Sequence, residues 1–165
     1  IILGDKQMSN QVVATLKTVL SNKLVDCLAG TIKYNQGNLS LESRGGVYGI
    51  AIKLDKKRKK DFFQKYNEKD IITFEEWKSI GDYYYPLYWG KDSNLGFRLF
   101  SHIHTRDSLG TLQLDSRQYL NQYFDKGKII YGAVLCNKIS CCETELRNTF
   151  PDIFITHVGK YDFPN

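Results

Sequence analysis

The run VYGIAIKL, residues 47–54, most constrains how this chain can fold. Its apolar side chains recur at every second position, which is the period of an extended strand with one face against a core. That face carries Tyr48, Ile50, Ile52 and Leu54. Two further strand-like runs follow, at 83–90, which is rich in tyrosine, and at 128–136, which is apolar. Three strands are therefore predicted.

Helical patterns lie between and after these strands. Residues 94–104 read as a helix with Asp92 or Ser93 as its N-cap, and 116–124 as a second helix. A third is predicted over 142–150, where Pro151 ends it. This order of strands and helices predicts a small mixed α/β or α+β domain.

A length of 165 residues suggests one domain with elaborations. Residues 1–44 form a predicted N-terminal extension, with an amphipathic helix over 9–28 and a short hairpin over 31–43. Residues 55–82 read as an insert between the first two strands, with a short helix over 74–80. The C-terminal tail after Pro151 is a candidate for a last strand.

Composition narrows the possible partners only slightly. The chain is 42% hydrophobic and 25% charged, with a net charge of +5, which is compatible with nucleic acid. The four cysteines form no CxxC pair, which argues against a structural zinc site and favours reduced thiols in a cytoplasmic protein. No apolar run is long enough to span a bilayer, and the first residues lack the layout of a signal peptide.

The helix predicted over 94–104 carries two polar residues beside its apolar stripe. Leu95, Leu99 and Ile103 form the stripe, and Arg98 and His102 lie one turn apart along its flank. Side chains there can project into a cleft beside the sheet. From the helical wheel alone, an arginine that covers apolar surface and a histidine that hydrogen-bonds locally is the favoured interpretation.

The residues around this helix resemble a known nuclease motif. Tyr88-Trp89-Gly90 is followed by Asn94 four residues after the glycine, by Arg98 eight residues after it, and then by His102. This spacing resembles the second half of the GIY-YIG nuclease motif, and Gly46-Val47-Tyr48 resembles the first half. The segment from Glu143 to Pro151 resembles the late helix of that family, so the resemblance runs from about residue 45 to residue 151.

Three departures from the family pattern are visible. Tyr48 and Tyr88 stand 40 residues apart, because an insert separates the two halves, as in restriction-enzyme members of the family. Trp89 replaces the usual aliphatic residue. Phe154 stands close to the place where the family often has an asparagine.

The resemblance implies a small domain with a central three-stranded sheet flanked by helices, and a single divalent metal, Mg²⁺ or Mn²⁺. Glu143 is the expected ligand, with Glu145 as its rival. Tyr48 is the expected general base or water-orienting group, with His102 or Lys91 to lower its pKa or take its proton. Arg98 would bind the scissile phosphate and Tyr88 would hydrogen-bond the phosphate or the water.

The resemblance further implies contacts with DNA. The run DKKRKK is ordinarily a solvated turn, but in a nuclease it could contact phosphates. The candidate DNA-binding residues are Lys56, Lys57, Arg58, Lys59, Lys60, His104 and Arg106.

The expected function is a Mg²⁺-dependent endonuclease acting on double-stranded DNA, a type II restriction enzyme that works as a homodimer. The alternatives are a repair or mobile-element nuclease, and a non-catalytic DNA- or protein-binding module on the same fold.

Overall fold

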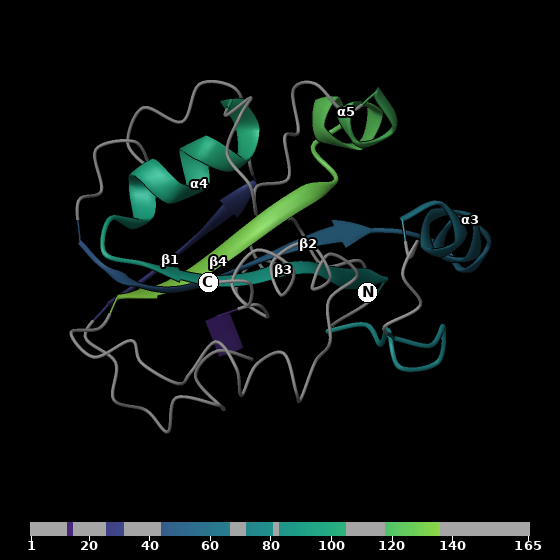
Figure 1. The fold of residues 1–165 in the computed structure, drawn as a ribbon, viewed down its shortest axis with the longest axis horizontal. Coiled ribbons are helices and arrows are strands. Elements are labelled where there is room, and N and C mark those ends of the chain that lie inside the picture. Colours follow the sequence, from purple (N-terminus) through teal and green to yellow (C-terminus); the bar gives the residue numbers. More distant parts are fainter. Residues whose placement is uncertain are drawn as a thin grey trace, which may run out of the picture.

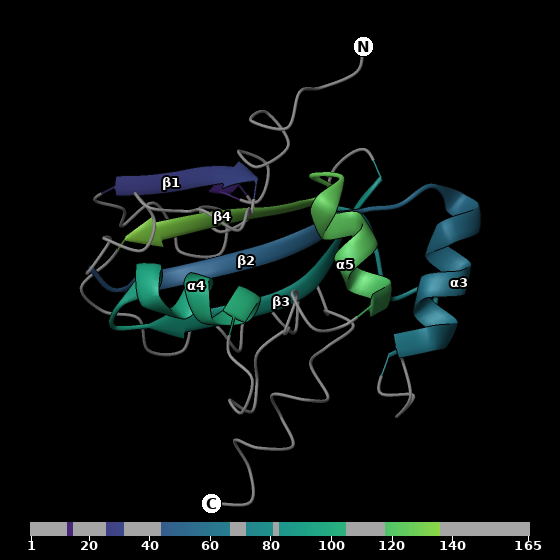
Figure 2. The ribbon, with the colours of Figure 1, turned by 90° about the horizontal axis from the view of Figure 1, so that it is seen from above.

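A computed structural model describes residues 13–14, 26–31, 44–66, 72–80, 83–104 and 118–135. Its elements, in chain order, are β1 (Asp26–Thr31), β2 (Gly46–Lys53), α3 (Lys56–Tyr66), β3 (Tyr84–Asp92), α4 (Leu95–His104), α5 (Gln118–Asp125) and β4 (Ile129–Leu135) (Figure 1). The strands form one antiparallel sheet in the order β1-β4-β2-β3, which Figure 2 shows from above. The predicted α+β fold is confirmed.

The three strands predicted from the sequence are β2, β3 and β4. The strand β2 lies between the other two, so Tyr48 faces Gly90 on one side and Ala133 on the other. The strand β2 is buried along nearly its whole length, which fits its almost continuous apolar sequence. The order β4-β2-β3 is the central three-stranded sheet that was expected.

A fourth strand, β1, extends this sheet at the β4 edge. The helix predicted over 9–28 is therefore wrong at its end, since residues 26–28 lie in β1 and pair with residues 133–135. The apolar spacing of this stretch fits a helix, but pairing with β4 decides its conformation, because strand preference depends on tertiary context. Thr31 ends β1, and the rest of the hairpin predicted over 31–43 lies outside the described residues.

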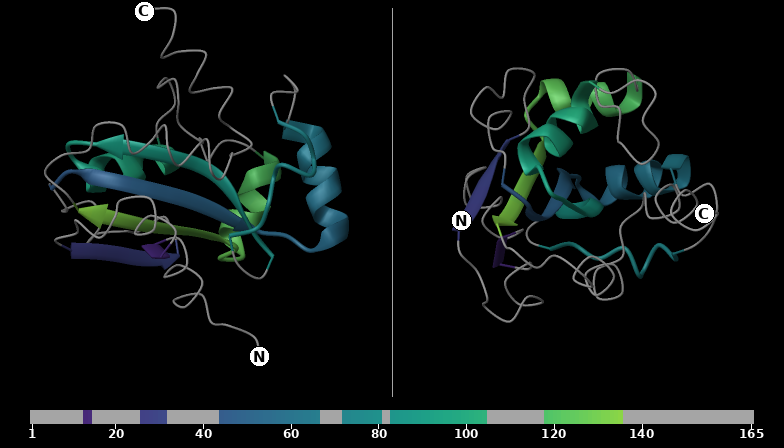
Figure 3. Two further views of the ribbon diagram at one scale, coloured as in Figure 1. Left: turned by 90° about the horizontal axis from the view of Figure 1, so that it is seen from below. Right: turned by 60° about the vertical axis from the view of Figure 1, so that its left-hand side comes forward.

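The helices α4 and α5 lie over the same face of the sheet (Figures 1 and 3). Leu95, Leu99 and Ile103 of α4 are fully buried against that face, as the apolar stripe predicted. Burying each such side chain stabilises the fold by about 1.5–3 kcal/mol. The stripe thus fixes which flank of α4 meets the sheet, and with it the positions of Arg98 and His102.

The cap of α4 differs from the prediction. The side-chain oxygen of Asn94 accepts a hydrogen bond from the backbone N–H of Phe97 at 3.0 Å, which makes Asn94 the N-cap. Asp92 instead accepts from the N–H of Asn94 and so fixes the turn before the helix. The backbone N–H of Leu95 donates to the carbonyl of Arg44, which ties the start of α4 to the entry of β2.

The insert contributes to the core. Its basic run, for which a solvated turn and a contact with DNA phosphates were both considered, forms the first turns of α3, and Asp55 caps that helix by accepting from the N–H of Arg58. Phe62 of α3 and Trp77 are both fully buried and stack on each other, and the indole N–H of Trp77 donates to the carbonyl of Pro86 at 2.7 Å.

The short helix predicted over 74–80 is a turn instead. Thr73 and Glu76 bond each other reciprocally, as at the start of a helix. The turn does not continue into a helix, and Trp77 directs its ring into the core.

The remaining predicted elements agree with the structure or lie outside it. The second helix, expected over 116–124, is α5, shifted by one or two residues. The helix predicted over 142–150 and the strand predicted in the tail lie outside the described residues. Among the helices that the structure describes, none has the length and apolar character to cross a bilayer.

Candidate active site

Four residues from three elements form one hydrogen-bonded cluster. The hydroxyl of Tyr48 on β2 lies 2.8 Å from Nε2 of His102 on α4, and it accepts a hydrogen bond from Nε of Arg98 at 3.2 Å. A terminal nitrogen of the Arg98 guanidinium donates to the hydroxyl of Tyr88 on β3 at 3.0 Å. Arg98 therefore bridges the two tyrosines, and His102 closes the cluster from the next turn of the helix.

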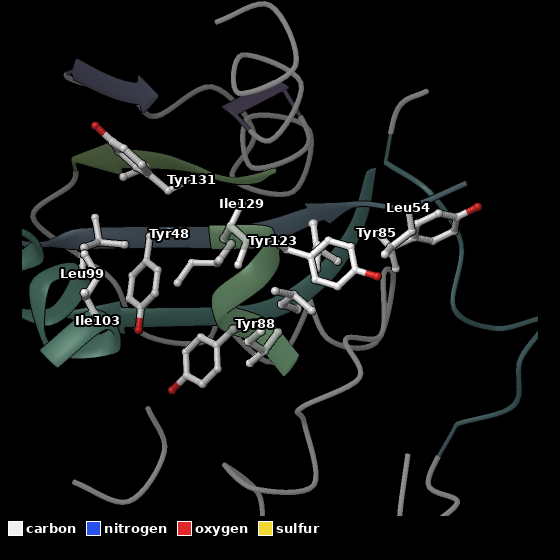
Figure 4. Packing of buried hydrophobic residues seen from close by; sticks show 14 of the residues in the cluster. Tyr48, Leu54, Tyr85, Tyr88, Leu99, Ile103, Tyr123, Ile129 and Tyr131 are labelled. Atoms are coloured by element: carbon white, nitrogen blue, oxygen red, sulfur yellow. The ribbon is translucent and has the colours of Figure 1, made fainter. Parts of the chain in front are cut away.

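The aromatic rings of the cluster also pack against one another. The rings of Tyr48 and Tyr88 stack with centroids 5.8 Å apart, and the His102 ring meets the Tyr88 ring edge-on at 4.5 Å. Figure 4 shows the hydroxyls of Tyr48 and Tyr88 pointing to the same side, while the Tyr131 hydroxyl points away from them. The sheet and α4 together thus hold both phenols toward one charged group.

Two glycines permit close approach in this part of the sheet, one to the rings of the cluster and one to the backbone of β4. Gly90 lies opposite Tyr48 in the sheet, and a Cβ there would lie 2.5 Å from the Tyr48 hydroxyl and 2.7 Å from the Tyr88 ring. At Gly46, a Cβ would lie 2.0 Å from the carbonyl oxygen of Val134 on β4. The glycines at the two ends of the predicted motif are therefore required by close approach, one to a ring and one to a backbone.

Burial sets the protonation states of the cluster. Complete burial raises the pKa of Tyr48 well above its usual value, and Tyr88 raises it further, while Arg98 acts in the opposite direction. Burial also lowers the pKa of His102 well below its usual value, and the positive charge of Arg98 adds to this effect. At neutral pH Tyr48 is a phenol and His102 is a neutral imidazole.

These states assign the direction of the hydrogen bonds. Burial lowers the pKa of Arg98, but the hydroxyls of Tyr48 and Tyr88 more than offset this, so Arg98 remains a cation and a donor. With the His102 proton on Nδ1, the Tyr48 O–H donates to the lone pair of His102 Nε2, and the Tyr48 oxygen accepts from Arg98. A proton can therefore pass from Tyr48 to His102 over a single hydrogen bond.

The cluster is closed around Tyr48. The side chains of Tyr48 and His102 are fully buried and Tyr88 is 4% exposed, whereas Arg98 is only partly buried. A ligand therefore approaches along Arg98, and contact with the Tyr48 hydroxyl requires a displacement of the groups that cover it.

The structure does not bring Lys91 into the cluster. Lys91 lies opposite Val47 in the sheet, and the side chains of this pair are on the other face from Tyr48 and Gly90. Lys91 is exposed there. Of the two candidates to take a proton from Tyr48, His102 has the position and Lys91 does not.

A metal site is not assembled from the described residues. Across the described ranges, no group of three or more His, Cys, Asp or Glu side chains could hold a metal ion. The cluster offers phenols, an imidazole and a guanidinium, whereas Mg²⁺ prefers carboxylate oxygens. Glu143 and Glu145 lie outside the described residues, so a carboxylate ligand from that segment stays a prediction.

The candidate DNA-binding residues have different surroundings. Lys56, Lys57, Arg58 and Lys60 are exposed on α3. Lys59 is packed instead: its ammonium lies over the rings of Phe74 and Tyr85 and donates to the carbonyl of Phe74 at 3.1 Å. Burial lowers the pKa of Lys59, although Glu75 opposes this.

Two of the candidate DNA-binding residues carry no structural description of their side chains. His104 is the last residue of α4, and nothing further is described of it. Arg106 lies outside the described residues.

A second polar site was not anticipated from the sequence. A cavity of about 170 Å³ lies at the far end of β2 from Gly46. It is lined by Lys53, Asp55, Arg58, Tyr83, Tyr123 and Lys128. In the sequence, Lys53 stands at the end of the first strand run and Lys128 at the start of the last one. They meet only because β2 and β4 are antiparallel neighbours.

No protein-family model, curated protein or solved structure matches this chain.

Proposed function

We propose that this protein is a GIY-YIG-type endonuclease that hydrolyses phosphodiester bonds of double-stranded DNA with the help of Mg²⁺ or Mn²⁺. The observation that supports this most is the hydrogen-bonded cluster. Its three motif residues Tyr48, Tyr88 and Arg98 come from separate parts of the chain and meet His102 within hydrogen-bonding distance.

The charge of the cluster suits a phosphodiester. Arg98 is its only cation, and the tyrosine hydroxyls hold the guanidinium in place at the sheet. A guanidinium pairs with phosphate oxygens in a planar, two-bonded geometry that an ammonium cannot match. In the proposed complex, Arg98 offsets the negative charge that grows on the phosphate oxygens as water attacks.

The hydrogen bond between Tyr48 and His102 supports a proton relay. As a water molecule attacks phosphorus, its proton passes to the Tyr48 hydroxyl oxygen, and the Tyr48 proton passes to His102 Nε2. The hydroxide forms the new P–O bond while the bond to the leaving oxygen breaks. Burial and Arg98 disfavour an imidazolium at His102 in the free protein, so the relay requires the bound phosphodiester, whose negative charge offsets that of Arg98. Tyr48 ends the step as a phenol, and His102 gives up its proton when the cluster opens to release the product.

A divalent cation, when bound, would stabilise the charge on the leaving oxygen. Glu143, with Glu145 as its rival, is the proposed carboxylate for it. We further propose a type II restriction enzyme that acts as a homodimer in the cytoplasm, since a two-fold DNA site suits a two-fold protein.

One observation favours a second candidate, a non-catalytic binding module. The complete burial of Tyr48 and His102 is also what a purely structural polar network requires. The two candidates differ in whether any DNA is cut.

Digestion of several unmethylated genomic DNAs, with Mg²⁺ or with EDTA, tests the proposed activity. Discrete bands that require Mg²⁺ are expected, and Arg98→Ala in parallel guards against contaminating nucleases. A Mg²⁺-dependent smear would indicate a nuclease without sequence specificity. Absence of cleavage on every DNA would favour the binding module.

A further inference from the structure

The cavity at the far end of β2 is lined by more positively charged than negatively charged side chains. Lys53, Arg58 and Lys128 line it, and Asp55 is the one carboxylate among the lining residues that the structure describes. Asp55 is already engaged, because it caps α3 and lies 3.8 Å from Arg58. Among these described residues, no further carboxylate balances the two lysines.

The two lysines are held together by the sheet. The backbone N–H of Lys53 donates to the carbonyl of Lys128 at 2.9 Å, so the residues are neighbours on adjacent strands. Both are partly buried. Like charges side by side on a sheet are destabilising, and proteins depart from local rules of this kind mainly at functional or strained sites.

Tyrosines complete the lining of the cavity. Tyr123 comes from α5, and Tyr83 precedes β3 with a φ of 65°, a left-handed conformation that is uncommon for an aromatic residue. The carbonyl of Tyr83 accepts from the N–H of Leu54, while its side chain is 52% exposed. Cationic side chains beside an exposed aromatic ring are a combination that proteins use to bind nucleic-acid strands.

We infer that this cavity binds a phosphate group, with Lys53, Arg58 and Lys128 as its partners, and that the phosphate belongs to the nucleic acid held at the Tyr48 cluster. The assignment of the phosphate to DNA rests on the proposed function, whereas the phosphate chemistry rests on the cavity alone.

The distance between the two sites fits one bound strand of DNA. Tyr48 and Lys53 are five residues apart on β2, which corresponds to about 17 Å at the rise of a strand. Residues five apart on a strand lie on opposite faces, so Lys53 leaves β2 on the other face from Tyr48, and the cavity lies at the end of the strand, where Tyr123 of α5 also lines it. A duplex with one phosphate at Arg98 would pass the end of the sheet to place another phosphate at the cavity.

The test measures DNA binding by fluorescence anisotropy at several salt concentrations, with a labelled duplex and EDTA to prevent cleavage. Lys53→Gln and Lys128→Gln are compared with Lys78→Gln, an exposed lysine outside the cavity, and thermal melting checks that each variant folds. Each cavity variant should bind more weakly, with a slope of log K against log[salt] reduced by about 0.9, while Lys78→Gln matches the parent.

A second arm separates the sources of phosphate. Inorganic phosphate is added without DNA, and the shift in melting temperature is compared between the parent and the two cavity variants. If the parent does not bind DNA but is stabilised by phosphate, and both cavity variants lose this, free phosphate is the ligand, the phosphate chemistry stands, and the nuclease proposal fails.

Other outcomes contradict the site itself. A parent that binds DNA, with cavity variants that bind equally well and with the same salt slope, would refute the cavity as a phosphate site and leave the nuclease proposal intact. A parent that responds neither to DNA nor to phosphate would refute both.

Discussion

Replacing Tyr48 with phenylalanine removes one oxygen atom from the centre of the buried cluster. Two groups lose their partner: Nε2 of His102, 2.8 Å away, and Nε of Arg98, 3.2 Å away. A neutral hydrogen bond contributes about 1 kcal/mol, and one from a charged donor contributes about 1.5–3 kcal/mol. Arg98 is only partly buried and regains some hydration, so the free energy of unfolding should fall by about 2–3 kcal/mol.

This loss is measurable by urea unfolding or calorimetry. For a chain of 165 residues it corresponds to a fall in melting temperature of about 4–12 °C, with the fold retained. The matched control is Tyr131→Phe, which removes a hydroxyl from another buried tyrosine on the neighbouring strand β4, where it points away from the cluster (Figure 4).

The same variant reports on the relay. Loss of the Tyr48 hydroxyl should lower the cleavage rate by about 10²–10⁴, the usual contribution of a positioned acid or base, while Tyr131→Phe should cut normally. A Tyr48→Phe protein that is as stable as the parent would show that the hydroxyl makes no such bonds. One that is destabilised yet cuts at the parent rate would show a structural network without a catalytic role.

The remaining predictions concern pH, packing and charge. The pKa of His102 is lower in the folded protein than in the unfolded chain, where it is about 6.5. Its contribution to stability is therefore present above that value and is lost as pH falls below it, by up to about 1.4 kcal/mol per pH unit. In urea unfolding between neutral and acidic pH, the stability of His102→Gln should depend less on pH than that of the parent. Gly90→Ala should destabilise by about 1–3 kcal/mol, since its Cβ would collide with the Tyr48 ring, and an unchanged melting temperature would contradict that packing. Trp77→Ala should cost about 3–5 kcal/mol in urea unfolding, and a smaller loss would mean that the insert is peripheral to the core. Arg98→Lys should lower the cleavage rate by about 100-fold while changing the salt-dependent affinity for DNA little, because the charge is retained. Full activity would show that only the charge matters.

The sequence predicted the elements whose patterns agree with their tertiary surroundings. The strands β2 and β4 are buried on both faces and carry near-continuous apolar runs, and α4 has an unbroken stripe at Leu95, Leu99 and Ile103. In each case local preference and packing point to the same structure, so periodicity alone was sufficient.

Errors arose where a distant partner decides the outcome. Residues 26–28 have helical spacing but pair with β4. Trp77 turns into the core, where its indole N–H donates to the carbonyl of Pro86, instead of continuing a helix. Neither partner can be identified from the neighbouring residues in the chain. The basic run after Asp55 is different, because its N-cap is the residue directly before it.

The candidate site could be predicted in part. Motif spacing selected Tyr48, Tyr88, Arg98 and His102, and the structure places all four in contact. Alternation along β3 alone places Lys91 on the other face from Tyr88 and Gly90, a signal that the motif spacing does not use. The cavity with Lys53 and Lys128 could not be predicted, because the two lysines meet only across paired strands.

The most direct test of the proposed catalytic cluster is the single-turnover cleavage rate of Arg98→Ala on a DNA fragment that the parent protein cuts in the presence of Mg²⁺. The cluster predicts that cleavage is lost while the variant still folds and melts cooperatively. Cleavage by Arg98→Ala at the parent rate would contradict the assignment of this cluster as the active site.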